Sequence, residues 1–244
     1  MMKCRFVLFW LLTSVWIWVI PDMMTGEVFA GEVLTRVRSN KVVRCGVTEP
    51  LAGFSFKDEN GQWHGFNIDF CRAVAVAALN DSEKVTLTPL SSPQRFPSLL
   101  LGRIDLLAHT TTWTFGREAG VGIQFPGVYF YAGQTFMVPS EKKIKKIIQL
   151  NDATIGVEKS TTFQSNLADT FQARGISYKP LVMDSQEEMV KALLDDRCQA
   201  ITAEQSVLAA IRAKIPGGLE KFDIMNEKIS KEILCPAVQR GDDE

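Results

Sequence analysis

The chain has 244 residues, 46% of them hydrophobic, which is enough to bury the core of one large globular domain or two small ones. Its 27 basic and 28 acidic residues leave a formal net charge of −1, with no long run of either sign. This balance disfavours a nucleic-acid or membrane-surface partner. We therefore expect no nucleic acid and a small-molecule partner.

Residues 1–30 differ in character from the rest of the chain. Lys3 and Arg5 precede an apolar run from Phe6 to Ile20, and small residues follow around Ala30. This layout predicts a cleavable secretory signal peptide with cleavage near Ala30, and hence a periplasmic protein. The alternative is a membrane anchor, but about fifteen apolar residues fall short of the roughly twenty that a spanning helix needs.

From Lys41 onward, strand-like and helix-like segments alternate. The first series is "VVRCGVT", "DFCRAVAVAALN", "KVTLTPL", "SSPQRFPSLLLG" and "RIDLLAH", and a second series starts with "ATIGVEK". Strands separated by helices predict mostly parallel sheets, and the restart predicts two α/β lobes. In the first helix, we expect Phe70, Val74, Ala77 and Ala78 to form the buried face.

The lysine-rich segment "EKKIKKIIQL" follows Pro139 and Ser140, where the second series begins. We interpret it as an amphipathic helix whose lysines face water. Ile144, Ile147 and Ile148 would then face the core. A basic membrane helix is the alternative.

The cysteines beyond the signal peptide are Cys45, Cys71, Cys198 and Cys235, an even number in a compartment where disulfides persist. Cys45 lies in a predicted strand and Cys71 opens a predicted helix. A bridge between these neighbouring elements is one interpretation, and two buried free thiols are the other.

Two threonine clusters follow predicted strands. Thr110 and Thr112 lie in "AHTTTWTFGR", and Thr161 and Thr162 lie in "EKSTTFQ". Open parallel sheets bind ligands beyond the carboxyl ends of their strands. A helix starting near Thr161 would present unpaired N–H groups and a positive dipole end to an anion. The alternative is an ordinary helix cap.

Three further residues are candidates for the same edge. Arg117 supplies a cation, Glu204 lies at another predicted strand-to-helix transition, and Phe54 lies in the loop after the first strand. A cation, N–H donors and an acid in one cleft would suit a zwitterion. Glu204 could instead be an ordinary first-turn acid of a helix.

Motifs for catalysis are missing from the sequence. We find no G-x-S-x-G elbow, P-loop or G-x-G-x-x-G, so no cofactor is expected. The only histidines, His64 and His109, form no acid–base pair, and no close cysteine pair indicates a metal site. Binding without reaction is therefore the expected activity.

Several motifs occur in the order of a known family. They are "NGQWHGFNID", the threonine turn ending in Arg117, "GVEKSTTFQSNLAD", "CQAITAEQS" and "ISKEILCPAVQRGDD". From about Lys41 to Glu244 the chain resembles the periplasmic polar amino-acid-binding proteins of ABC transporters, of the glutamine- and histidine-binding kind. It is most similar to the general L-amino-acid binders.

The resemblance implies a type II periplasmic-binding-protein fold. Each of two lobes would hold a mixed, mostly parallel sheet flanked by helices, and a two-strand hinge would join them. The lobes would close on an L-amino acid and deliver it to an integral-membrane ABC permease. Lobe 1 would comprise residues 41–136 plus 233–244, and lobe 2 residues 137–232. We expect a monomer.

The resemblance also assigns roles to residues. Arg117 matches the arginine that clamps the ligand carboxylate, and Glu204 takes the place of the aspartate that receives the ligand ammonium. The remaining matches are the hydroxyl and backbone contacts of Thr110 and Thr112 and the N–H donors of Thr161 and Thr162.

The sequence departs from the family in two respects. The general binders often carry a cysteine where this chain has Gly156, and this chain gains Cys235. Besides Cys45–Cys71, Cys198–Cys235 is therefore the second disulfide to test. The family also continues beyond "CPAVQRGDD", so we expect a first lobe that is truncated at its C-terminal end.

Three alternatives remain open at this point. Dehydratases and cell-wall lyases resemble the same two-lobe fold, and Glu204 could serve as their acid. The chain could also be the sensor half of a membrane receptor, or a truncated remnant without function.

Overall fold

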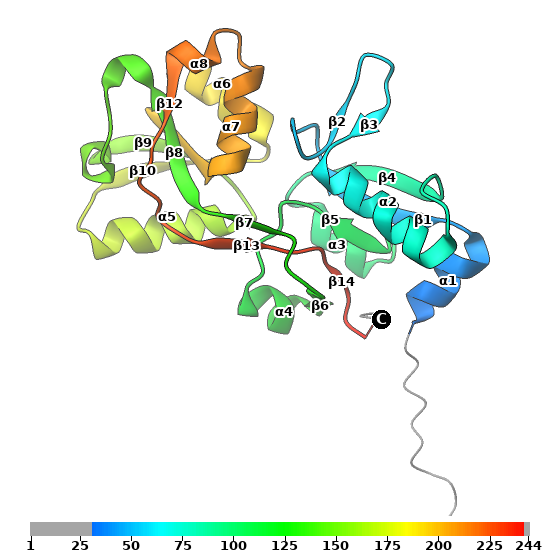
Figure 1. Ribbon diagram of the computed structural model, residues 1–244. Coiled ribbons are helices and arrows are strands. Elements are labelled where there is room, and N and C mark those ends of the chain that lie inside the picture. Colours follow the sequence, from blue (N-terminus) through cyan, green and yellow to red (C-terminus); the bar gives the residue numbers. More distant parts are fainter. Residues whose placement is uncertain (1–30, 242–244) are drawn as a thin grey trace, which may run out of the picture.

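The computed structural model describes residues 31–241 as two α/β lobes. Figure 1 shows the lobes side by side, with two extended strands crossing between them. The expected signal peptide, residues 1–30, lies outside the described residues. Within residues 31–241, no helix is long and apolar enough to cross a membrane.

The first lobe is built on a parallel sheet of strand order β4-β1-β5. Its strands are β1 (Val43–Thr48), β4 (Val85–Leu90) and β5 (Leu106–Ala108). Its helices are α1 (Glu32–Asn40), α2 (Phe66–Leu79) and α3 (Arg95–Leu100), and a hairpin joins β2 (Phe56–Lys57) to β3 (Trp63–His64). The alternation predicted from "VVRCGVT" to "RIDLLAH" is confirmed.

The second lobe is built on a mixed sheet of strand order β10-β9-β11-β8-β12. The first three strands are parallel, whereas β8 and β12 run antiparallel to their neighbours. The strands are β8 (Gln134–Pro139), β9 (Ala153–Glu158), β10 (Tyr178–Met183), β11 (Ala200–Glu204) and β12 (Phe222–Ile224). The helices are α5 (Thr162–Ala173), α6 (Gln186–Leu194), α7 (Gln205–Lys214) and α8 (Gly218–Lys221).

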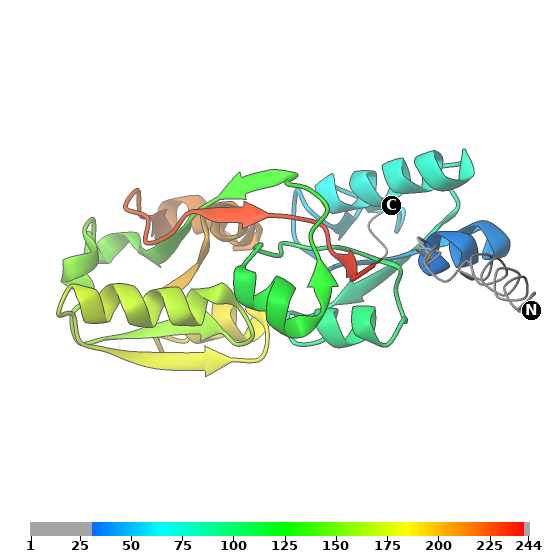
Figure 2. The same cartoon turned by 90° about the horizontal axis from the view of Figure 1, so that it is seen from below.

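Two antiparallel strands, β7 (Phe130–Ala132) and β13 (Glu232–Leu234), connect the lobes. Figure 2 shows them lying side by side between the two sheets. The second sheet already begins at Gln134, slightly before the expected boundary at residue 137. We propose that the division between the lobes runs through β7 and β13.

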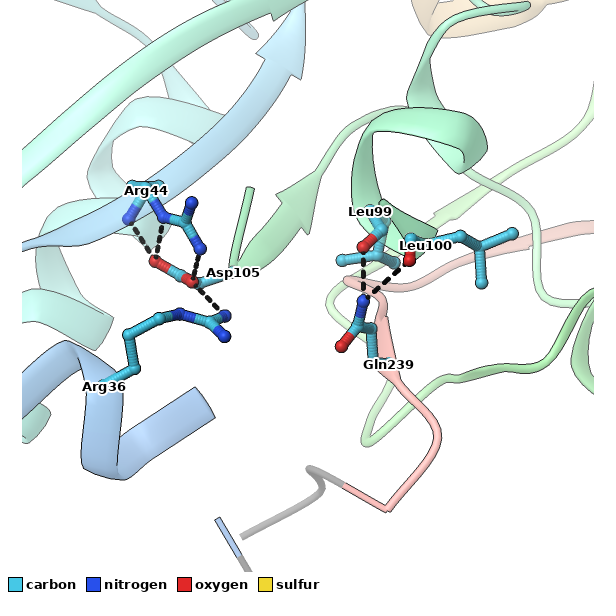
Figure 3. Close-up of polar contacts among 6 residues, drawn as sticks. All are labelled: Arg36, Arg44, Leu99, Leu100, Asp105 and Gln239. Atoms are coloured by element: carbon cyan, nitrogen blue, oxygen red, sulfur yellow. Dashed lines mark hydrogen bonds and ion pairs between the residues drawn. The ribbon is translucent and has the colours of Figure 1, made fainter. Parts of the chain in front are cut away.

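The last strand ties the chain end back to the first lobe. β14 (Val238–Gln239) pairs with β6 (Ile123–Gln124), next to α4 (Phe115–Val121). The side-chain amide of Gln239 donates hydrogen bonds to the carbonyls of Leu99 and Leu100, at 2.7 and 3.1 Å (Figure 3). These bonds hold the carboxyl end of α3 in place. The same helix begins at Arg95, which lines the pocket described below.

The N-terminal helix α1 is an element that the sequence reading did not predict. Its Arg36 and the β1 residue Arg44 both bind the carboxylate of Asp105, at 2.7 and 2.5 Å (Figure 3). Desolvation alone would raise the pKa of Asp105, but the hydrogen bonds from both arginines outweigh it and hold that pKa below its ordinary value.

The predicted face of helix α2 is only partly confirmed, because Phe70, Val74 and Ala78 are half-buried against the core but are not its most buried residues. Asn67, Ile68, Cys71 and Ala75 are buried against the sheet, whereas Ala77 is exposed. The predicted face is rotated because a run of alanines and valines lacks the polar residues that would mark the solvent side.

The lysine-rich segment is not the predicted amphipathic helix. It forms two short 3₁₀ turns, η1 (Ser140–Lys142) and η2 (Ile147–Leu150), separated by residues 143–146, which are not helical. Ile147 is fully buried as predicted, but Ile148 is 56% exposed. Lys143 adopts a left-handed φ of 52°, which interrupts any continuous helix.

The disulfide between Cys45 and Cys71 is present, with Cα atoms 6.1 Å apart, and it joins β1 to α2. The second pairing does not form within residues 31–241, because Cys198 and Cys235 are free and buried. Cys198 belongs to the core of the second lobe and Cys235 to that of the first.

Candidate functional site

The carboxyl ends of the two sheets meet at a single polar pocket between the lobes. Its lining residues are Ser92, Arg95, Thr110, Thr112, Arg117, Glu158, Thr161, Thr162, Phe163, Gln186 and Val207. The cavity volume is about 10 Å³, close to the space that one water needs. An organic ligand therefore enters only when the lobes move apart.

Arg117 lies in this pocket, as the sequence predicts. Thr114 caps the start of α4, and its Oγ1 accepts a hydrogen bond from the Arg117 N–H at 3.2 Å. The guanidinium donates to the Thr112 carbonyl at 2.7 Å, which folds the side chain back over the threonine turn. Burial lowers the pKa of Arg117, while Glu232 and Glu204 counteract the shift. The result is a partly desolvated cation at the pocket wall.

The second threonine cluster forms the facing wall. Thr161 is the N-cap of α5, and Thr162 is the first residue of that helix, as predicted. Thr162 Oγ1 lies 3.4 Å from Thr112 Oγ1, so the two clusters meet across the lobes. The first N–H groups of α5 have no partner within the helix, and with the helix dipole they favour an anion between the clusters.

Glu204 ends β11 and is the N-cap of α7. It does not line the pocket, although Val207 of α7 does. The residue is completely buried, and neither carboxylate oxygen has a hydrogen-bond partner among the described residues. Burial raises the pKa of Glu204 to about 8, helped by Glu232 and opposed by Arg95 and Arg117.

Arg95 is a pocket residue that the sequence reading missed. It is only 2% exposed, and its Nη2 donates to the Ser160 carbonyl of the other lobe at 3.0 Å. Its guanidinium also lies 4.8 Å from the centre of the Phe96 ring. Burial lowers the pKa of Arg95 to about 9, which still leaves it cationic at neutral pH. The pattern of "SSPQRFPSLLLG" predicts only a helix, and a charged residue in such a pattern is usually exposed.

Glu158 is the second missed residue. It ends β9, is 3% exposed and lines the pocket. Burial raises its pKa, while hydrogen bonds with Ser92 and Gln186 and the charge of Arg95 act in the opposite direction. Its position directly before the threonine cluster, at the carboxyl end of a strand, is the signal that could have revealed it.

A buried hydrogen-bond network connects the pocket to the hinge. Glu232 on β13 accepts from Asn166 Nδ2 at 2.7 Å and from Ser230 Oγ at 2.5 Å. Thr162 Oγ1 donates to its other oxygen at 3.3 Å. The start of α5 is thereby linked to a strand that joins the lobes.

The candidate Phe54 and the buried His109 contribute no charge to the pocket. Phe54 does not line it but packs in the core against Phe66 and Phe130, with ring centres 6.4 and 5.6 Å away. Burial and the nearby Arg95 lower the pKa of His109 to about 3, so this histidine stays neutral. Within the described residues, no group of His, Cys, Asp or Glu is arranged to hold a metal ion.

Two α/β lobes, joined by paired strands and facing a shared polar pocket, define the class of two-lobed solute-binding proteins. The chain matches the family of bacterial extracellular solute-binding proteins, family 3, over residues 43–232, and it belongs to that family. The fold is that of the type II periplasmic binding proteins, as the sequence predicts.

Curated relatives support the same assignment. The chain is 40% identical over 211 residues to the general L-amino acid-binding periplasmic protein AapJ of Rhizobium johnstonii, which covers 86% of this chain and 62% of the relative. It is 36% identical over 213 residues to the glutamate/glutamine/aspartate/asparagine-binding protein BztA of Rhodobacter capsulatus, which covers 87% of this chain and 63% of the relative. The chain thus spans less than two thirds of the length of these relatives.

A solved structure is similar over most of the chain. The periplasmic binding protein of an ABC transporter from Brucella ovis, with glutathione bound, superposes with a TM-score of 0.82 at 39% identity. The match covers 86% of this chain and 65% of that protein.

Proposed function

We propose that the protein binds an L-amino acid between its lobes in the periplasm and delivers it to an ABC permease for uptake. It acts as a monomer and without catalysis. An N-terminal signal peptide cleaved near Ala30 exports it. The names of the relatives support this proposal, since they include a general L-amino-acid binder and a glutamate/glutamine/aspartate/asparagine binder.

One observation carries the proposal: Arg117 and the start of α5 line the pocket, and the buried acid Glu204, outside the lining, acts electrostatically on Arg117. Arg117 and the N-terminus of α5 receive the carboxylate, with Thr110, Thr112 and the Thr161 and Thr162 amides completing its hydrogen bonds. Glu204, buried without a hydrogen-bond partner among the described residues, receives the ammonium. A lyase or dehydratase would need an acid–base pair, which this arrangement does not favour.

Closure of the lobes is the proposed mechanism. The contacts that cross the pocket, Thr112 to Thr162 and Arg95 to the Ser160 carbonyl, bring both lobes around one small cavity. A ligand that touches both lobes binds the closed state more tightly than the open state, and so shifts the population toward closure.

Calorimetric titration of Arg117→Ala tests the proposal. Removing one partner of a buried charge pair costs about 2–5 kcal/mol, so the affinity for the bound amino acid should fall roughly thirty-fold to several thousand-fold. Arg103→Ala, at an exposed arginine of the same lobe, should bind normally. Equal affinity of the Arg117 variant and the wild type would refute the assignment.

A further inference from the structure

A second cavity, separate from the polar pocket, lies beside the β2–β3 hairpin of the first lobe. Its volume is about 480 Å³, which falls within the roughly 300–1,000 Å³ typical of sites for small molecules. We call this cavity the hairpin groove. None of the residues that line it also lines the pocket between the threonine clusters. The lining residues include Pro50, Ala52, Phe56, Lys57, Trp63 and Lys214.

Both lobes build the hairpin groove. The second lobe contributes Lys214, the last residue of α7, and Figure 1 shows this helix facing the hairpin across the lobes. Lys214 Nζ donates to the Pro50 carbonyl of the first lobe at 2.8 Å. Next to Pro50, Leu51 and Phe54 belong to the same buried cluster as the core of the second lobe. The complete groove is therefore a feature of the closed arrangement of the lobes.

The walls of the groove supply flat apolar surface. Phe56 on β2 and Trp63 on β3 are half-buried, so part of each ring remains accessible. Pro50 and Pro89, both exposed, add their rings to the lining. Aromatic side chains bind other rings through offset-stacked or edge-to-face contacts. A ligand with an aromatic body therefore suits these walls.

The charged groups that line the groove are cations. Lys57 Nζ lies 5.1 Å from the centre of the Trp63 ring, and Lys214 completes the lining from the other lobe. Neither ammonium takes part in an ion pair among the described residues. Asp58, the acid next to Lys57, instead caps its own turn and pairs with His64 at 3.0 Å. The groove thus offers two cations to an anionic ligand.

We propose that the hairpin groove binds a small aromatic carboxylate, and that the occupied groove favours the closed arrangement of the lobes. The aromatic body packs against Trp63 and Phe56, and the carboxylate pairs with Lys57 and Lys214. A single negative charge suits the site better than a doubly charged phosphate, because Lys214 lies at the negative end of the α7 dipole.

The link to closure follows from the origin of the lining residues. A carboxylate that Lys57 and Lys214 hold together connects the first lobe to the second. Such a ligand binds the closed state more tightly than the open state and shifts the population toward closure. The groove is then a regulatory site, because an amino acid that binds an already closed population has less of the cost of closure to overcome.

Titration calorimetry with indole-3-acetate and its neutral amide, indole-3-acetamide, tests the charge recognition. The wild type should bind the acid with a Kd of about 0.1–1 mM, and about three- to tenfold more tightly than the amide. Lys57→Gln/Lys214→Gln should abolish this preference and leave the affinity for the amide unchanged. Equal affinity of the wild type for both probes, or an unchanged preference in the double variant, overturns the proposal.

Lys84→Gln/Lys179→Gln is the matched control. It removes the same net charge from two exposed lysines, one in each lobe, that do not line the groove. The preference for the acid should persist in this variant. Arg117→Ala separates the groove from the polar pocket, because the affinity for indole-3-acetate should not change. A loss of binding in Arg117→Ala places the probe in the polar pocket and overturns the proposal.

Small-angle X-ray scattering tests the link to closure. Saturating indole-3-acetate should reduce the radius of gyration of the wild type and of Lys57→Gln. It should not reduce that of Lys214→Gln, which lacks the cation from the second lobe. Binding without compaction in the wild type overturns the regulatory role. Compaction by indole-3-acetate in a protein that binds no amino acid supports the groove and refutes the function proposed above.

Discussion

At the scale of single residues, the site depends on charges held away from water. Arg95, Arg117, Glu158, Glu204 and Glu232 influence one another within one buried region. Their protonation is consequently coupled to whatever ligand enters. The effect is largest at Glu204, because burial is complete and neither oxygen has a hydrogen-bond partner in the described chain.

Ligand binding should release a proton from Glu204. Because burial raises its pKa to about 8, the ligand-free carboxyl is mostly neutral at pH 7, whereas an ammonium ligand favours the ionised form. The affinity should therefore increase as the pH rises from about 6 to about 8, by at most about tenfold per pH unit. Calorimetry in buffers of different ionisation enthalpy measures the number of protons released.

The Glu204→Gln variant is the control for this prediction. It should bind more weakly and release no proton, and its affinity should depend less on pH. The stability of the protein should also depend on pH. Because folding raises the pKa of Glu204, the free energy of unfolding of the ligand-free wild type should decrease as the pH rises toward 8. That of the variant should not. Equal proton release in both proteins would exclude Glu204 as the source.

The residue types alone indicated much of the site. Thr110, Thr112, Arg117, Thr161 and Thr162 all line the pocket, because each follows a strand end where loops meet a helix. Arg95 and Glu158 were missed, because a charged residue within a helix or strand pattern is usually exposed. Only the opposite lobe, approaching within hydrogen-bonding distance at Ser160, buries Arg95.

At the scale of elements, the strongest covalent restraint joins β1 to α2. The Cys45–Cys71 disulfide closes a loop of 26 residues and includes the β2–β3 hairpin within it. Gly65 caps α2 at φ 117°, where a Cβ would lie 2.6 Å from the Phe54 backbone. The hairpin and the helix can pack this closely only because the position is a glycine.

Loss of this disulfide should lower the stability of the protein. A closed loop of this length contributes about 3 kcal/mol, so Cys45→Ser/Cys71→Ser should unfold at lower denaturant concentration than the wild type. The stability of Cys198→Ala should still decrease when reductant is added, because Cys198 is a free thiol and the variant keeps the Cys45–Cys71 disulfide. Urea unfolding with and without reductant measures both effects. No change in the double variant would show that the bridge is unimportant for stability.

The lysine-rich segment is an element whose secondary structure the local hydrophobic pattern predicted wrongly. The spacing of Ile144, Ile147 and Ile148 is compatible with a helix face, yet the chain forms two 3₁₀ turns. Gln149 Oε1 accepts from the backbone of Lys145 and Lys146, and Glu227 accepts from Ile147. A local side chain, Gln149, and one long-range partner, Glu227, therefore replace the hydrogen bonds that a helix would have made.

At the scale of the whole molecule, the proposed function requires that the lobes separate and close again. A cavity of about 10 Å³ cannot admit an amino acid. The chain crosses between the sheets at β7 and β13, and Glu232 on β13 bonds to Thr162 at the pocket wall. The strand that would bend is thus directly connected to a residue that contacts the ligand in the proposed function.

Small-angle X-ray scattering should detect this closure. The radius of gyration of the ligand-free protein should exceed the value calculated from the structure, and adding the bound amino acid should reduce it. Arg117→Ala should show no compaction at the same ligand concentration, whereas Arg103→Ala should compact normally. Identical scattering with and without ligand would contradict closure as the mechanism.

The sequence by itself determined the alternation of strands and helices, the two-lobe fold and the threonine–arginine signature of the pocket. These follow from local hydrophobic pattern, residue type and motif order, which need no knowledge of distance. The sequence left open whether Cys45 and Cys71 are bridged, and the structure decided that they are. The tertiary structure decided which charges are buried together, that Phe54 packs in the core, and that Cys198 and Cys235 lie in separate cores. Burial and electrostatic coupling depend on how two distant segments meet, and no local pattern of residues contains that information.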